Sequence, residues 1–238
     1  LGAASPPPAQ RVLSVAPRAL QDMQQIGEAG GDGTVRIGLM PSVSSLLFPL
    51  LPQTLAETFP RLRVEFHDRA NDALVRELLS GQIDFAVGAI DSSIPAELQV
   101  YPLREDPFVA VLHGDDPLAG QPHLPWKLLA GRDIAVFSKG NIQRLVGALA
   151  ESHRLMLNTR YQVDYIETLY GLVRSRLAIA ILPELYTTHL CDPHLKIAQL
   201  QQPALSRTVA LMRGPQTLPP LIESSFALLL SSLREVNP

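Results

Sequence analysis

The chain has 238 residues, of which 46% are hydrophobic and 18% charged, and its formal net charge is −3. That length and apolar content are enough for one large core or two smaller ones, which excludes a disordered chain. The negative net charge excludes a whole-chain positive field that would hold phosphates, so we expect these residues alone to bind DNA poorly.

A single cysteine, Cys191, excludes a disulfide within the chain and favours a reducing compartment. The first residues lack the basic region and the continuous apolar stretch of a signal peptide. No apolar run approaches the roughly 18 residues of a membrane-spanning helix. We therefore expect a cytoplasmic protein that contacts no membrane.

The N-terminal part of the sequence differs in composition from the rest. Residues 1–9 are small and Pro-rich, which predicts a flexible start. From Gln10 to Glu28, apolar residues recur at three- and four-residue steps, which predicts an amphipathic helix despite Pro17. Glycines then cluster up to Gly33, where we place the boundary of the main domain.

Beyond Gly33, short apolar strands alternate with amphipathic helices. The predicted strands are VRIGL, RVEFH, DFAVGAI, FVAVLH, DIAVF, YQVDY, LAIAILP and RTVALMR. The predicted helices cover 44–59, 72–79, 142–152, 166–174 and 220–236. This order predicts an α/β fold with mostly parallel sheets. Because VRIGLMPSVSSLLFPLL and DIAVFSKGNIQRLVGAL both pass from a strand through a Ser-containing turn into a helix, we expect two similar lobes.

Four segments in a fixed order resemble the pattern of LysR-type transcriptional regulators. They are GTVRIGL, LLFPLLPQTLAETFPRLRVEF, LVRELLSGQIDFAVG and ETLYGLVRSRLAIAILPE. The resemblance implies the effector-binding domain of that family: two Rossmann-like lobes with a cleft between them, like type 2 periplasmic binding proteins. Arg176 and Ala178 depart from the pattern, which usually has Gly at both places. The turn is expected to differ here, because Arg pays a steric cost in a left-handed conformation.

The resemblance also implies how the domain is divided. Residues 34–103 with 207–238 would form regulatory lobe I, residues 104–206 lobe II, and residues 10–30 the end of a linker helix. A winged helix-turn-helix, absent from this chain, would precede that helix and provide the only contact with DNA. The regulatory domains would pair antiparallel in a homodimer, and the full-length protein would form a tetramer.

Candidate effector contacts lie in loops that follow strands and open helices. In open α/β sheets, ligands bind beyond the carboxyl ends of strands, where helix N-termini present unpaired N–H groups. The loops contribute Ser42 and Ser44, Asn71, Ser138 and Asn141, and Thr168. By the resemblance, Ser42 falls on a recurrent effector-contacting serine, Asn71 on a position that often contacts the ligand, and Thr168 faces the cleft. Simple helix capping is the competing interpretation for these residue types.

Together the candidate contacts would suit a small anionic metabolite. The segment THLCDPH offers zinc-type ligands in His189, Cys191, Asp192 and His194, but the motif is isolated, so we expect no metal. The usual nucleotide, hydrolase and metalloprotease motifs do not occur, so we expect no cofactor, no catalytic residue and no enzyme. A periplasmic-type solute-binding protein is the main alternative, and a two-lobed transferase is a weaker one.

Overall fold

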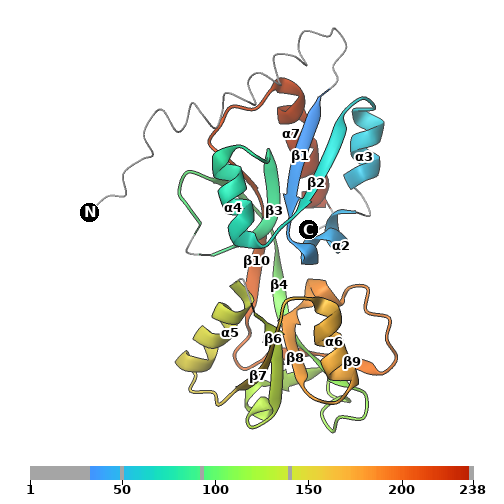
Figure 1. The fold of residues 1–238 in the computed structure, drawn as a ribbon, viewed down its shortest axis with the longest axis vertical. Helices are drawn as coiled ribbons and strands as arrows, with labels where there is room; N and C mark the ends of the chain where they lie inside the picture. The colour runs from blue at the N-terminus through green and yellow to red at the C-terminus, as the bar shows by residue number, and fades with distance from the viewer. Residues whose placement is uncertain (1–32, 49–50, 92–93, 139–140, 236–238) are drawn as a thin grey trace, which may run out of the picture. The chain divides into compact units, whose positions relative to one another are not determined.

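The structure is a computed structural model that describes residues 33–48, 51–91, 94–138 and 141–235. The predicted flexible start at 1–9 and linker helix at 10–30 lie outside these residues. The chain divides into two compact units. Unit 1 combines the described residues up to Leu103 with those from Ala210 onward, and unit 2 is the single segment Arg104–Val209. The chain passes between the units twice, in strands β4 (Gln99–His113) and β10 (Ser206–Arg213), which Figure 1 shows.

Unit 1 is built on a sheet in which β1 (Thr34–Leu39) lies between β2 (Arg63–Asp68) and β3 (Phe85–Ile90), both parallel to it, with β10 beyond β3. Its helices are the short turn Pro41–Val43, α2 (Ser44–Leu47), α3 (Leu51–Thr58), α4 (Asn71–Ser80) and α7 (Pro220–Glu235). Right-handed crossovers from β1 to β2 and from β2 to β3 run in opposite directions, which puts α3 and α4 on opposite faces.

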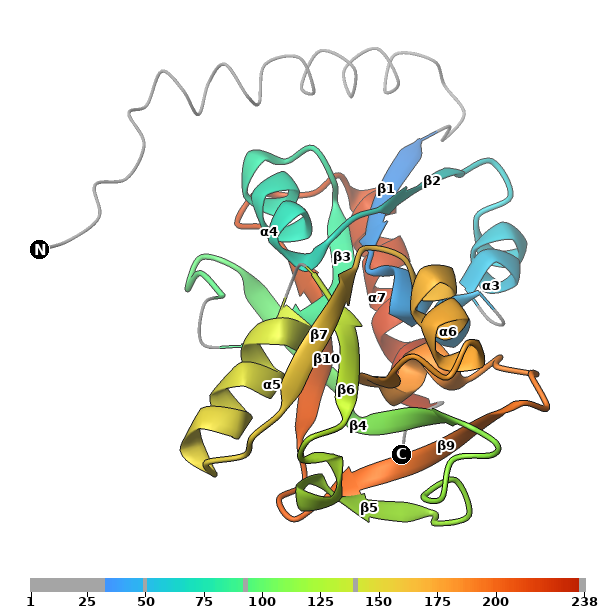
Figure 2. The same cartoon turned by 60° about the horizontal axis from the view of Figure 1, so that its bottom comes forward.

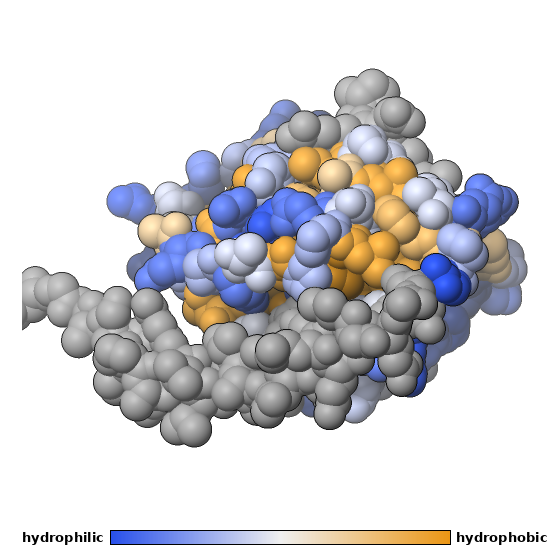
Figure 3. Space-filling model, turned by 90° about the horizontal axis from the view of Figure 1, so that it is seen from above, coloured by the Kyte–Doolittle hydropathy of each residue, from blue (hydrophilic) through white to orange (hydrophobic). Residues whose placement is uncertain are grey.

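Helix packing completes the core of unit 1. Helix α4 contacts β1 and β3, and α7 contacts α3. Figure 2 shows α4 in front of the sheet and α7 behind it. Helix α4 ends at Gly81, whose φ of 70° and N–H bonds to the carbonyls of Glu77 and Leu78 are typical of a glycine that ends a helix. Figure 3 shows hydrophobic residues among hydrophilic ones on the face seen from above.

Unit 2 holds a second, mixed sheet. Strand β6 (Asp133–Phe137) lies between β7 (Asn158–Val163) and β8 (Ile179–Pro183), parallel to both. Strand β4 runs antiparallel to β8 and to β9 (Leu195–Gln201), and β9 pairs in parallel with β5 (His123–Pro125). The helical segments are Trp126–Leu129, α5 (Asn141–Ser152), α6 (Ile166–Arg174) and Glu184–Thr187. Trp126 anchors the core, since it is fully buried and its Nε1 donates to the carbonyl of Pro203 at 2.9 Å.

The predicted α/β class is confirmed, but several element boundaries were wrong. The helix predicted over 44–59 is two helices, α2 and α3. Strand β4 begins at Gln99 rather than Phe108, β7 ends at Val163 rather than Tyr165, and β5 and β9 were not predicted. None of the helices in the described part of the chain combines the length and apolar character that a membrane span requires.

Candidate functional site

The candidate residues of unit 1 lie in two neighbouring loops that follow β1 and β2. The N–H of Arg69 donates to the carbonyl of Leu39 at 3.0 Å, so the ends of these two strands are joined. Ser42 is 3% exposed in the turn after β1. The Ser44 hydroxyl donates to the carbonyl of Pro41 at 2.7 Å, so it serves its own turn. No serine of this loop whose side chain is described acts as an N-cap, because the cap positions are Met40 and Val43.

Asn71 opens α4 and has a structural partner. Its Oδ1 accepts the N–H of Ala89 at 3.0 Å, and the residue is 7% exposed. The capping interpretation is wrong, because the N-cap of α4 is Ala70 and no side chain caps it. Asn71 instead joins the start of α4 to the end of β3. Gly88 leaves room for it, since a Cβ there would lie 2.6 Å from Asn71 Oδ1.

In unit 2, Ser138 and Asp164 join the carboxyl ends of the parallel strands β6 and β7. The N–H of Ser138 donates to the carbonyl of Val163 at 2.8 Å, and its hydroxyl donates to Asp164 Oδ1. Ser138 was predicted as a contact in this loop, but Asp164 was not. The available signal was its position directly after β7, because side chains at the carboxyl ends of adjacent parallel strands meet at one edge of the sheet.

Asn141, the first residue of α5, carries an unusual buried donor. The residue is 5% exposed, and among the described residues its Nδ2 finds no hydrogen-bond acceptor. Leaving such a donor buried and unpaired costs about 1–3 kcal/mol, and in native structures it often marks the place of an unseen water, ion or ligand. The helix N-terminus adds N–H groups and partial positive charge at the same point.

Thr168 lies in the first turn of α6, which follows β7, and its side chain is exposed. It does not cap the helix, because the N-cap is Tyr165 and no side-chain bond is made there. Helix α6 is fixed by Tyr170, whose hydroxyl donates to the carbonyl of Tyr186 at 2.8 Å. Burial raises the pKa of Tyr170 to about 12, so this hydroxyl stays a neutral donor at ordinary pH.

Two groups of candidate residues result, one in each unit. Ser42, Ser44 and Asn71 share the carboxyl end of the sheet in unit 1. Ser138, Asn141 and Thr168 share the carboxyl end of the β6–β7 pair in unit 2, together with Asp164. Within these groups, Ser44, Asn71 and Ser138 are engaged in structural hydrogen bonds, whereas Asn141 has an unused donor.

The segment THLCDPH does not gather a ligand set. Asp192 is held by Arg174, whose Nε donates to it at 2.6 Å, and by the N–H of His194 at 2.9 Å. The hydrogen bond from Arg174 is the main reason that the pKa of Asp192 is lowered. Cys191 is exposed. Within the described ranges, no three His, Cys, Asp or Glu residues come together as metal ligands would.

The family model described as LysR substrate binding domain matches residues 28–234. The chain belongs to this family. The resemblance carried by its four sequence segments is thereby confirmed.

The chain resembles LysR-type regulators both in sequence and in fold. The chain is 26% identical over 181 residues to an uncharacterized HTH-type transcriptional regulator, YfeR, of Shigella flexneri, covering 74% of this chain and 57% of that protein. It is 29% identical over 155 residues to the dual regulator OxyR of Escherichia coli, covering 64% and 50%. The effector binding domain of QuiR in complex with shikimate has a TM-score of 0.78 at 18% identity, covering 87% of this chain and 99% of that one. The chain therefore spans 50–57% of the length of these two curated relatives.

Proposed function

We propose that this chain senses a small anionic metabolite for a transcriptional regulator, and that Asn141 is its main contact in unit 2. The buried, unpaired amide of Asn141 at the N-terminus of α5 carries the proposal. An acceptor oxygen of a ligand would satisfy this donor, and the helix N-terminus favours negative charge. Structures of LysR-type domains include one bound to a small molecule, since QuiR holds shikimate.

The neighbours of Asn141 define the rest of the contact. The Ser138 hydroxyl donates its hydrogen bond to Asp164, so the lone pairs of its oxygen can still accept a hydrogen bond from a ligand. Thr168 offers an exposed hydroxyl at the start of α6. Ser42 is the proposed contact of unit 1, on the strength of the family resemblance. Ser44 and Asn71 are secondary contacts in this proposal: the Ser44 hydroxyl donates within its own turn, and Asn71 Oδ1 accepts the N–H of Ala89.

A disulfide-based sensor is disfavoured within this chain. Several relatives carry the name hydrogen peroxide-inducible genes activator, and some solved structures are oxidized and reduced forms of OxyR. This chain has one cysteine, Cys191, so it cannot form a disulfide within itself. A reversibly bound metabolite therefore fits its composition better than an internal thiol pair.

The activity of the whole protein is part of the proposal. We propose that an N-terminal winged helix-turn-helix makes the DNA contacts and that the cytoplasmic protein works without a membrane, as a homodimer within a tetramer. The relatives are HTH-type regulators of which this chain matches about half, which supports regulation over catalysis. It also favours a regulator over a periplasmic solute-binding protein. Strands β2 and β7 end their sheets, and edge strands of this kind readily support pairing between subunits.

A thermal-shift screen of small organic acids tests the effector proposal. The screen is run on the wild-type chain and on Asn141→Leu, Ser42→Ala and Thr168→Val. Without ligand, Asn141→Leu should be at least as stable as wild type, because it removes a buried unpaired donor. With ligand, it should lose most of the rise in melting temperature, whereas the control Gln143→Leu on the same helix should keep it.

Two results would contradict the proposal. If Asn141→Leu, Ser42→Ala and Thr168→Val all respond to an acid as wild type does, the contacts are wrong. If only neutral or cationic compounds raise the melting temperature, the anionic character of the effector is wrong. Light scattering of the chain at high concentration tests the dimer, and a monomeric mass would count against it.

A further inference from the structure

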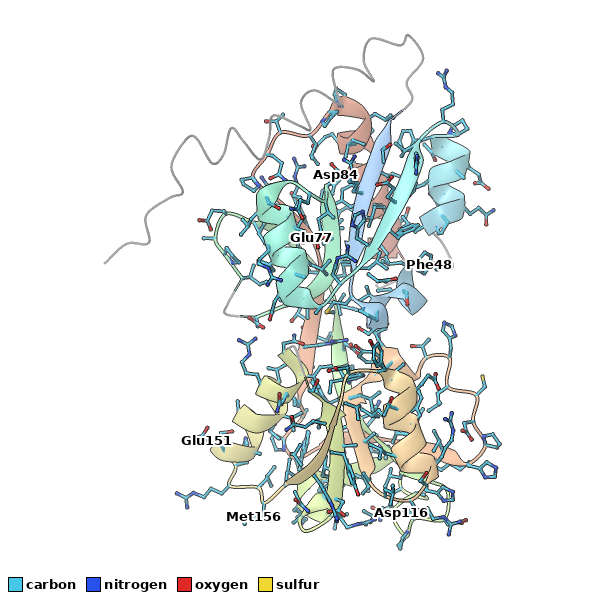
Figure 4. The ribbon with its side chains drawn as sticks, in the orientation of Figure 1. Phe48, Glu77, Asp84, Asp116, Glu151 and Met156 are labelled. Atoms are coloured by element: carbon cyan, nitrogen blue, oxygen red, sulfur yellow. The ribbon has the colours of Figure 1, made fainter. Side chains whose placement is uncertain are left out.

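Unit 2 contains a pocket of about 320 Å³ at the end of its sheet opposite to Ser138. Its lining comes from the end of β4 and the residues just after it, and from the residues that directly precede and begin β6 and β8. Because β6 and β8 are parallel, their amino ends lie together, whereas Ser138 follows the carboxyl end of β6. Figure 4 labels Asp116, one of the lining residues, at the lower end of unit 2. The pocket is therefore separate from the candidate effector contacts of this unit.

Charges of both signs line the pocket. Arg132 Nη2 pairs with Asp116 Oδ2, and Arg176 Nη2 pairs with Asp115 Oδ2. No further hydrogen bond or ion pair joins either guanidinium to a described residue, so each keeps several N–H groups for another acceptor. The side chain of Asp115 is 65% exposed, which leaves its carboxylate accessible to a ligand.

The position of Arg176 is unusual for an arginine. Its φ is 59°, and the N–H groups of Arg176 and Leu177 bond to the carbonyls of Val173 and Leu172, which is the helix ending usually made by glycine. The turn thus keeps the left-handed conformation despite the side chain, contrary to the expectation that Arg176 would change it. A side chain held in a costly conformation with its charge lining a pocket is consistent with a binding role.

An apolar wall adjoins these charges. Leu177, directly after Arg176, is an apolar side chain that is nevertheless 49% exposed, and it lines the pocket together with Pro117. A pocket of about 300 Å³ is at the lower end of the range that holds small organic ligands. The lining therefore offers cations, anions and apolar surface within reach of one small molecule.

We infer that this pocket binds a free α-amino acid with an apolar side chain. The spare N–H groups of Arg132 and Arg176 would take its carboxylate, Asp115 its ammonium group, and Leu177 and Pro117 its side chain. A simple anion would be repelled by Asp115 and Asp116, and a simple cation by the two guanidiniums. Only a zwitterion meets partners for both of its charges, because guanidinium binds carboxylate and carboxylate binds ammonium.

Calorimetric titration of the chain with L-alanine, L-valine, L-leucine, L-isoleucine, L-methionine and L-phenylalanine tests the inference. At least one should bind, and its analogues without the amino group or without the carboxyl group should each bind at least about tenfold more weakly. Asp115→Asn and Arg176→Gly should weaken binding of the amino acid by a similar factor. Since glycine suits a left-handed position, Arg176→Gly does not endanger the fold.

Arg154 provides a matched control. It also has a left-handed backbone, with φ of 53°, and ends α5 through the same pair of bonds, from Arg154 to Glu151 and from Leu155 to Ala150, but it does not line the pocket. Arg154→Gly should leave binding unchanged. The inference is overturned if none of the six amino acids binds at about 10 mM, a concentration that would reveal even millimolar affinity. It is equally overturned if Arg176→Gly binds like wild type, or if Asn141→Leu rather than Arg176→Gly removes binding.

Discussion

Arg207 holds Asp106 through two hydrogen bonds to one carboxylate oxygen, from Nε at 2.9 Å and from Nη2 at 2.8 Å, with both side chains withdrawn from solvent. The other oxygen of Asp106 accepts the N–H of Leu185 at 3.0 Å. Arg207 also lies over the ring of Tyr186, 5.9 Å from its centroid. The pair thus joins the two strands, β4 and β10, in which the chain passes from one unit to the other.

Breaking this pair from one side should be costly. Arg207→Met leaves a buried carboxylate without its cation, so we expect the free energy of unfolding to fall by about 3–5 kcal/mol. The double variant Asp106→Asn with Arg207→Met removes both charges and keeps an acceptor for the N–H of Leu185. It should recover most of the loss in urea unfolding, and a double variant no more stable than Arg207→Met would contradict this account.

Glu105, next to this pair in the sequence, should make the stability of the fold depend on pH. Hydrogen bonds from Ser206 and Thr208 to its two oxygens lower the pKa of Glu105. A carboxyl whose pKa is lower in the folded state stabilises the fold above its unfolded pKa, and this contribution is lost as pH falls through the folded pKa. Ser206→Ala with Thr208→Val should therefore destabilise the protein at neutral pH and progressively less below about pH 4. Urea titrations at several pH values measure the difference, and in a Glu105→Gln background its dependence on pH should vanish.

The left-handed turn at Arg176 predicts that glycine at this position gives a more stable protein than alanine, the reverse of the usual order. Alanine normally exceeds glycine in stability, but a Cβ at positive φ is strained. Arg176→Gly should therefore be more stable than Arg176→Ala by about 1 kcal/mol. Thermal unfolding of both variants measures this, and the same order is expected at Arg154. If Arg176→Ala is the more stable of the two, the left-handed conformation is not what this turn adopts.

Asn71 should matter for stability before any ligand is added. Asn71→Ala leaves the buried N–H of Ala89 without its acceptor, which we expect to cost about 1–3 kcal/mol. Gly88→Ala should act at the same point, because its Cβ would press on Asn71 Oδ1. Denaturant unfolding of the ligand-free variants measures both, and wild-type stability of Asn71→Ala would show that this hydrogen bond contributes nothing.

Local patterns in the sequence predict many of the elements but not all of them. Strand β6, helix α6 and strand β10 come within two residues of the predicted limits, because their apolar runs and periodicity are strong. Strand β9 was missed because the alternation of apolar and polar residues in LKIAQLQ is interrupted where Ile197 and Ala198 follow each other, and Ile197 is exposed. Its place in the sheet depends on β4 and β5, which are distant in sequence. The first half of β4, which is exposed or half-buried, also gives a weak signal.

The candidate site shows the same limit. The rule that ligand contacts follow parallel strands was enough to choose the loops of Ser42, Asn71, Ser138 and Thr168. It could not tell that Asn71 serves Ala89, that Ser138 meets Asp164, or that the amide of Asn141 is left without an acceptor. Each of these facts depends on a contact between residues brought together by the fold, and no spacing within one loop encodes them.

The two passages of the chain between the units set an order for synthesis on the ribosome. Unit 2 is one continuous segment, so all of it has been made once Val209 leaves the ribosome. Unit 1 starts earlier but lacks the rest of β10 and all of α7 until residues 210–235 have emerged. Unit 1 is thus begun first and completed last. Until then its sheet is incomplete, and α3 lacks its contact with α7.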